Sequence, residues 1–335
     1  IHRARALLDS RALMRNPIQV FEKYRKQLGQ TFTFHFAGVK RAIVSTDPDF
    51  IQHVLHKNQS NYRKSHIQVK RMREFNGYGL HNSHGERWLS MRRHLAKGFL
   101  TNRLKKMMPI QLEVMDEAME GFAQRAGEGP VDIYQEMVKV SLALIGKTLF
   151  GRRISDEELQ VIADAVSDIQ AFILRQIVQP YLIPWYRLSG KTAYYQKIRG
   201  EGESLIEEHI NIRRRDGGGG SDMLGHMLET LYEDTGRPME DSQLLIETLQ
   251  LLIAGNESSS IGMAWTFYLL ARHPECIARI RSEIESVVGE GPLDFAALRR
   301  LEYTAQVLNE ALRLYPPFWM IDRIAQEEDE AAGIH

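Results

Sequence analysis

The stretch Ser242–Arg272, SQLLIETLQLLIAGNESSSIGMAWTFYLLAR, predicts a single long helix at the centre of the fold. Acidic residues precede it, where they favour a helix start, and Pro274 follows it as a stop signal. No proline interrupts the stretch, which would extend for about 46 Å at ~1.5 Å per residue. Leucine and isoleucine cover most of the circumference of its first half. A helix that is apolar nearly all round is buried, so we expect this one to form the core of a mainly α-helical protein.

The middle of this stretch carries polar and small residues that an ordinary core helix would avoid. Gly255 costs helix stability, and Glu257 would be costly to bury without a partner. Gly255 also removes side-chain bulk, so that a flat group could lie against the backbone. The hydroxyl of Ser258 can donate a hydrogen bond back to the carbonyl of Ala254. An acid beside an alcohol at such a turn is a candidate proton relay, and the alternative is a solvent-facing kink.

Composition limits the class of protein. The chain has 335 residues, of which 43% are hydrophobic and 26% charged, and its 43 basic and 43 acidic side chains cancel. This is typical of a globular protein, and the absence of a basic surplus argues against a nucleic-acid binder. The single cysteine, Cys276, excludes a disulfide framework and a cysteine-based metal cage, and it suits a cytoplasmic location. No stretch of eighteen uncharged apolar residues is present, so we do not expect a membrane span.

Strand patterns are scarce in the rest of the chain. Residues 31–44 alternate around Ala37-Gly38 and predict a β-hairpin. Two breaks, Gln179–Gly190 and the four glycines Gly217–Gly220, are expected to be surface loops. The remaining periodic segments predict helices over residues 17–27, 85–98, 103–126, 132–150, 155–176, 191–213, 222–232, 274–288 and 303–314.

Two further pairs stand at helical spacing. Trp88 and Arg92 are four residues apart, and an indole N–H beside a guanidinium suits a carboxylate or phosphate ligand, although cation–π packing is the commoner explanation of such a pair. Glu310 and Arg313 predict an ion pair across one helical turn, which contributes little if it is solvated. The neutral chain also has a basic cluster, either a docking face or solvated surface, formed by Arg87, Arg92, Arg93, Lys97, Arg103, Lys105 and Lys106.

Taken in order, these motifs resemble the cytochrome P450 family. The resemblance rests on Trp88-x-x-x-Arg92, on residues 254–259 (AGNESS), and on Glu310-x-x-Arg313 followed by Tyr-Pro-Pro. It runs nearly end to end and is closest to the soluble bacterial branch related to fatty-acid hydroxylases. The resemblance implies one domain over residues 1–335, in which the central helix 242–272 and a small β-rich lobe hold haem b. The family's C-terminal part, with the cysteine thiolate that ligates the iron, is expected beyond His335. We therefore expect an incomplete domain with no metal ligand of its own.

The resemblance also implies roles for individual residues. Trp88, Arg92 and Arg323 match positions that bind the haem propionates, whereas Ala254 and Gly255 would lie over the haem. Glu257 and Ser258 match the acid–alcohol pair that delivers protons, with serine in place of the family's usual threonine. Glu310 and Arg313 match a buried ion pair of the folding core, and Gln179–Gly190 matches a mobile access lid. The matched substrate contacts are Met72, Phe75, Leu251, Phe318, Trp319 and Met320.

The implied activity is a monooxygenase reaction in which one oxygen atom of O₂ enters a C–H bond of a small lipophilic substrate, such as a fatty acid. The electrons would come from a separate ferredoxin or flavodoxin with its reductase, docked on the basic cluster of what we expect to be a monomer. Three alternatives stay open at this point: a peroxide-driven peroxygenase of the same fold, an all-α isoprenoid synthase, and an inactive fragment without haem.

Overall fold

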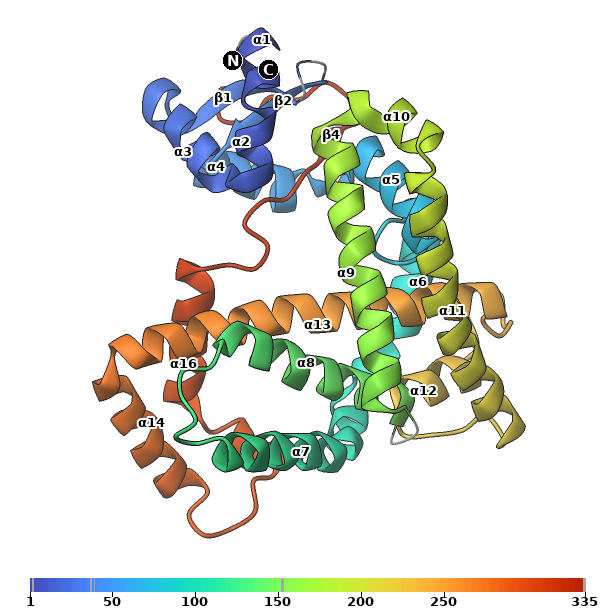
Figure 1. The fold of residues 1–335 in the computed structure, drawn as a ribbon, viewed down its shortest axis with the longest axis vertical. Helices are drawn as coiled ribbons and strands as arrows, with labels where there is room; N and C mark the ends of the chain where they lie inside the picture. Colours follow the sequence, from blue (N-terminus) through green and yellow to red (C-terminus); the bar gives the residue numbers. More distant parts are fainter. Residues whose placement is uncertain (2, 37, 39, 152–153, 334–335) are drawn as a thin grey trace. The chain divides into compact units, whose positions relative to one another are not determined.

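The chain is mainly helical with two small sheets, as predicted (Figure 1). This computed structural model describes residues 1, 3–36, 38, 40–151 and 154–333. It divides into two compact units. Unit 1 comprises Ile1–His84, Ala165–Glu201 and Asp322–His335, and unit 2 comprises Gly85–Asp164 and Gly202–Ile321. None of the described helices is long and apolar enough to cross a membrane.

Unit 1 begins with three helices packed on the predicted hairpin. Strand β1 (Thr31–Phe36) pairs antiparallel with β2 (Lys40–Ser45), which confirms the hairpin, although Ala37 of the predicted turn lies outside the described residues. Phe32 and Phe34 point to the same face of β1 and are buried against Tyr24 of α3. The helices of this part are α1 (Arg3–Leu8), α2 (Ser10–Arg15), α3 (Pro17–Leu28) and α4 (Pro48–Gln52).

The second sheet of unit 1 joins segments that are far apart in the sequence. Strand β3 (Tyr62–Arg63) pairs antiparallel with β4 (Ile324–Ala325). Short helices precede β3 and a longer one follows it: η1 (His53–Lys57), η2 (Gln59–Asn61) and α5 (His66–Asn76).

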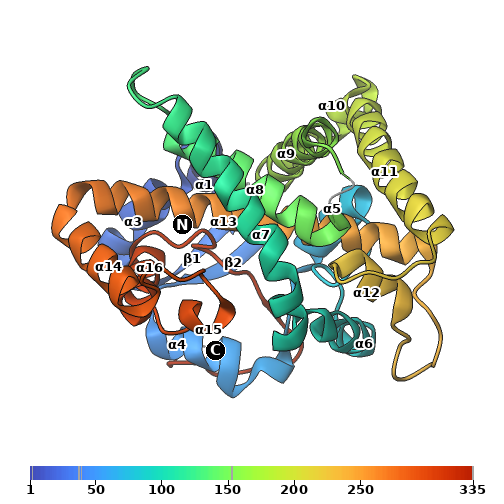
Figure 2. The same cartoon turned by 90° about the horizontal axis from the view of Figure 1, so that it is seen from below.

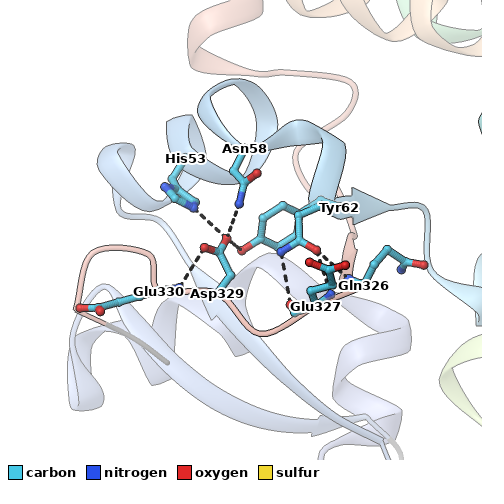
Figure 3. A network of polar contacts seen from close by, with 8 residues as sticks. His53, Asn58, Tyr62, Gln326, Glu327, Asp329 and Glu330 are labelled. Atoms are coloured by element: carbon cyan, nitrogen blue, oxygen red, sulfur yellow. Dashed lines mark hydrogen bonds and ion pairs between the residues drawn. The ribbon is translucent and has the colours of Figure 1, made fainter.

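Asp329 fastens the segment after β4 onto the segment before β3 (Figure 3). One of its carboxylate oxygens accepts hydrogen bonds from Tyr62 Oη at 2.7 Å and Asn58 Nδ2 at 3.1 Å, and lies 2.8 Å from His53 Nε2. These donors hold the pKa of Asp329 well below its usual range, because each of them stabilises the carboxylate form. The network therefore fixes the pairing of β3 with β4.

The predicted loop Gln179–Gly190 is helical. It contains η5 (Pro180–Leu182) and α10 (Ile183–Leu188), between α9 (Asp156–Val178) and α11 (Lys191–Arg215). The loop prediction failed because both prolines occupy the first turn of a short helix, where a missing N–H costs nothing.

Unit 2 is built around α13 (Asp241–Arg272), which confirms the predicted long helix. Helix α8 (Ile133–Phe150) lies along α13 in both ribbon views (Figure 1, Figure 2). The other elements of this unit are α6 (Gly85–Ala96), η3 (Lys97–Phe99), α7 (Thr101–Gln124), α12 (Met223–Glu229), α14 (Pro274–Val287), α15 (Phe295–Leu298) and α16 (Glu302–Leu314).

The four-glycine run is a loop, as predicted, and it wraps a buried ion pair. Arg213 donates two hydrogen bonds to Asp222 at 3.1 and 2.7 Å, and also bonds to the carbonyls of Gly219 and Phe150. Asp222 in turn caps α12 at the N–H of Gly225. Both charged groups are buried and fully engaged, so this pair organises the end of α11, the loop and the start of α12.

Candidate functional site

The middle of α13 is packed on one side and open on the other. Ser141 of α8 donates to the carbonyls of Gly255 at 3.3 Å and Asn256 at 3.0 Å. Around the helix from this contact, Ala254 is exposed and Ser258 is half-buried. Ser258 Oγ donates to the Ala254 carbonyl at 2.7 Å, which confirms the predicted bond, yet the helix continues without a break.

Gly255 serves helix packing in this structure, and its predicted position over a flat cofactor stays a prediction. A Cβ atom added at Gly255 would lie 2.6 Å from Ile145 Cδ1 and 2.7 Å from Ile145 Cγ1. The missing side chain therefore admits the isoleucine of α8 and allows the two helices to approach closely. Ala254, one position earlier, is the residue whose side chain faces the open side.

The acid and the alcohol of the predicted relay are adjacent but not bonded to each other. The side chain of Glu257 is exposed, and among the described residues it has no hydrogen-bond or ion-pair partner. The pKa of Tyr134, at the start of α8, is raised mainly by burial and secondly by the negative charge of Glu257. The relay role of Glu257 and Ser258 thus stays a prediction.

Trp88 and Arg92 lie on the exposed face of α6, with Met91, His94 and Leu95 buried on the opposite face. Within the part of the chain that the structure describes, neither side chain has a polar or cation–π partner, so the indole N–H and the guanidinium are both available to a ligand. The cation–π explanation for this pair is therefore not supported.

A polar chain that the sequence analysis missed holds α6 to α13. Arg87 donates to the side chain of Gln243, and Gln243 Nε2 donates to Glu247 Oε1 at 2.6 Å. Glu247 is a fully buried carboxylate on α13, four residues after Gln243. The sequence signal for this contact is the pair Gln243 and Glu247, two polar residues one helical turn apart in an otherwise apolar stretch.

The Glu310–Arg313 pair forms as predicted, but it is not buried. Arg313 Nε and Nη2 each donate a hydrogen bond to a carboxylate oxygen of Glu310 at 2.7 Å. The side chain of Arg313 is 67% exposed and that of Glu310 is 54% exposed. The expected burial is wrong for this structure, because none of the described segments packs over that face of α16.

Apolar side chains beside α16 are uncovered. The segment that follows the helix exposes Phe318, Trp319 and Met320 to between 40% and 67%. At the preceding turn, Tyr315 stacks on the partly exposed Trp265 of α13, with ring centroids 3.9 Å apart. Large exposed apolar side chains are candidates for contacts with a ligand. Leu251, on the open side of α13, is half-buried.

The site residues predicted for unit 1 differ in their surroundings. Phe75 is 0% exposed and packs edge-on against Phe172, with centroids 5.6 Å apart. The ring is part of the core of unit 1 in this structure, and its predicted contact with substrate stays a prediction. Met72 is half-buried, and Arg323 is exposed with a hydrogen bond only to the carbonyl of Asp322.

The residues present fit a porphyrin and its carboxylates, but they do not supply an axial thiolate. Ala254 offers a small side chain on an open, apolar helix face, and Trp88 and Arg92 offer unengaged donors for anionic groups. Cys276, the only cysteine, is half-buried on α14, and its proximity raises the pKa of the Tyr303 phenol. Its predicted role as a small packing residue stays a prediction.

The comparisons with known proteins bear on the whole chain. Residues 7–335 match the model of the cytochrome P450 family. The chain is 27% identical to cyclooctat-9-en-7-ol 5-monooxygenase of Streptomyces melanosporofaciens, over 88% of this chain and 63% of that protein. It is 26% identical to pentalenene oxygenase of Streptomyces avermitilis, over 89% and 65%. It is also 26% identical to cytochrome P450 72A15 of Arabidopsis thaliana, over 93% and 61%.

The chain spans a little under two thirds of the length of these relatives, which come from both bacteria and plants. With the family model matched from residue 7 onward, the chain belongs to the cytochrome P450 family.

Proposed function

We propose that this protein is a haem-dependent monooxygenase that inserts one oxygen atom from O₂ into a C–H bond of a small lipophilic substrate. The observation that carries the proposal is the open face of α13 at Ala254 and Ser258 in a chain of the cytochrome P450 family. The names of two relatives, which state oxygenation of cyclooctat-9-en-7-ol and of pentalenene, support a lipophilic substrate. Bound haem with a thiolate ligand supplies the chemistry of O–O cleavage and oxygen transfer.

The chain's own residues would bind the cofactor and move protons. Trp88 and Arg92 of unit 2 would hold propionate oxygens through charge-assisted hydrogen bonds. The propionate role of Arg323, which lies in unit 1, stays a prediction from the family resemblance. Ser258 would hold a proton at Oγ, which now bonds to the Ala254 carbonyl at 2.7 Å. The exposed carboxylate of Glu257 can exchange protons with solvent, which suits a general acid at the entrance of a relay.

In unit 2, the exposed apolar residues Phe318, Trp319 and Met320, together with Leu251, are the proposed substrate contacts. The substrate contact of Met72, in unit 1, stays a prediction from the family resemblance. The exposed basic side chains around Arg93 are the proposed docking face for a ferredoxin or flavodoxin, because opposite charge steers association. Lys97 of this cluster already pairs with Glu233 at 2.8 Å, which reduces its contribution.

The first experiment measures haem uptake and the reduced, CO-bound spectrum of the full gene product, because the described residues supply no thiolate ligand. We expect a strongly red-shifted Soret band from thiolate-ligated haem. Its absence from freshly made, haem-loaded protein would contradict the proposed ligation, and failure to bind haem at all would contradict the proposal as a whole.

The second experiment tests the relay and the electron source. Ser258→Ala should lower the fraction of consumed electrons that appears in product, whereas Ser259→Ala on the same turn should not. Arg93→Glu should raise the KM for the reduced donor, with Arg41→Glu in unit 1 as a control. Turnover with hydrogen peroxide but not with the reduced donor would favour the peroxygenase alternative.

A further inference from the structure

An open cavity of about 290 Å³ lies between the first two turns of α7 and the glycine loop that joins α11 to α12. All of it belongs to unit 2. Its lining combines basic, acidic and neutral polar groups, from Asn102, Arg103, Lys106, Gly220, Ser221 and Glu229. None of these residues takes part in the proposed haem, proton or substrate contacts. The mixture of groups suits a small polar ligand rather than an apolar one.

The loop side of the cavity has a fixed backbone. Arg213, which pairs with Asp222, donates a hydrogen bond to the Gly219 carbonyl at 3.1 Å. Gly220 lies so close to this pair that an added Cβ atom would collide with Arg213 Nη1. A Cβ atom added at Gly225 of α12 would lie 2.7 Å from the Gly220 nitrogen. The loop is therefore held between the buried ion pair and α12, and it lines the cavity from a defined position.

The hydrogen-bond donors of the cavity are not used within the protein. In the part of the chain that the structure describes, the side chains of the half-buried Arg103 and the exposed Lys106 have no hydrogen-bond or ion-pair partner. The backbone N–H groups of residues 219–221 also have no acceptor there. Cations and backbone N–H groups on one concave surface are the donors that bind oxyanions in proteins. The cavity is therefore suited to an anion with several oxygen atoms.

Glu229 restricts which anion can bind. Its Oε1 atom lies against the loop, 2.6 Å from the place of a Cβ atom added at Gly219, and among the described groups its carboxylate has no hydrogen-bond or ion-pair partner. An ionised carboxylate only accepts hydrogen bonds, so it repels an oxyanion without a proton and binds one that carries an O–H group. Inorganic phosphate keeps at least one P–OH group at neutral pH. Sulfate has none, and a phosphate monoester is mostly deprotonated because its second pKa is about 6.

We propose that this cavity is a binding site for inorganic hydrogen phosphate. Arg103 and Lys106 bind its anionic oxygens, and Glu229 accepts the hydrogen bond of the P–OH group. The hydroxyl of Ser221 and the N–H groups of the loop add neutral donors. The bound anion would join the start of α7 to the loop and to α12. The proposal goes beyond the proposed function and does not depend on it, because no residue of the site contacts haem or substrate.

The test is isothermal titration calorimetry of the haem-free full chain with inorganic phosphate, sulfate and glycerol phosphate at about pH 7.5, where the monoester has lost its last proton. We expect saturable binding of phosphate, at least tenfold tighter than that of sulfate. Arg103→Met and Lys106→Met should each weaken phosphate binding about tenfold. Lys105→Met is the matched control and should match wild type, because its ammonium lies over the Phe295 ring, 5.8 Å from the centroid. Glu229→Gln should remove the preference for phosphate over sulfate.

The outcomes separate the site from its ligand. Weak binding of all three anions without saturation, or equal losses in Lys105→Met and Lys106→Met, would mean an adventitious ion only and would overturn the site. A preference over sulfate that survives in Glu229→Gln would overturn the role of Glu229. Glycerol phosphate that binds as tightly as inorganic phosphate would overturn the assignment of the ligand. If circular dichroism shows that Arg103→Met is unfolded, Lys106→Met, at an exposed position, decides the question.

Discussion

Replacement of Gly255 by alanine tests which neighbour requires the glycine. The new methyl group would lie 2.6 Å from Ile145 Cδ1, 2.7 Å from Cγ1 and 3.3 Å from Cβ, all closer than normal contact. Overpacking of this kind costs roughly 1–3 kcal/mol. The higher helix propensity of alanine returns up to about 1 kcal/mol. We therefore expect Gly255→Ala to lower the free energy of unfolding by about 1 kcal/mol, since a β-branched isoleucine has little rotamer freedom in a helix with which to move away.

The assay is urea unfolding of the haem-free chain, followed by tryptophan fluorescence. Gly121→Ala in α7 is the matched control, because nothing lies within 4 Å of the added methyl group, and it should stabilise the protein. Ile145→Ala removes both clashing atoms, so the double variant with Gly255→Ala should lose less stability than the sum of the two single variants. If Gly255→Ala is as stable as the Gly121→Ala control and only haem affinity falls, the glycine faces the cofactor and our assignment is refuted.

Three further predictions concern stability. Arg213→Met should lower the free energy of unfolding in urea by about 3–5 kcal/mol, because it leaves the buried carboxylate of Asp222 unpaired. Arg214→Met removes an exposed ion pair and should lower it by less than ~1 kcal/mol. Equal losses in the two variants would contradict the burial argument. Burial lowers the pKa of His94 from 6.5 to about 4, so the unfolded chain takes up the proton first and stability should fall with pH below about 6.5. His94→Phe should flatten that pH dependence and His56→Phe, at an exposed position, should not. Asp329→Asn should lower the unfolding midpoint at neutral pH, and the difference from wild type should shrink toward acid as the native carboxylate is protonated; a constant difference would contradict this.

Local pattern predicted the long elements well. The helix at 242–272 and the hairpin at 31–44 follow from apolar periodicity and from proline or glycine at their ends, which act over a few residues. The Ser258–Ala254 bond was predictable for the same reason, since donor and acceptor are one helical turn apart. The segment 179–190 was mispredicted as a loop because a proline can mark either the end of one helix or the first turn of the next, and the sequence alone does not distinguish the two.

The surroundings of individual site residues were not predictable. Gly255 has an empty Cβ position, but only the packing of α8 reveals that Ile145 fills it. Phe75 has the same apolar character whether it lines a pocket or, as here, packs in the core against Phe172. Lys106 is one basic residue among several until the fold places it in one cavity with the distant Glu229. Each of these depends on contacts between residues more than a hundred positions apart, or across several elements.

The pairing of β3 with β4 determines when unit 1 can finish folding during synthesis. Hydrogen bonds between Tyr62 and Asp329 close a loop of more than 260 residues, so they cannot form until the ribosome has released nearly the whole of that length. The hairpin and its three helices can assemble early. The polar groups of residues 53–64 remain solvated until their hydrogen-bond partners after β4 have been synthesised. Unit 1 is therefore completed late in synthesis, and a chaperone that shields this unfinished edge would act longest on the segment around β3.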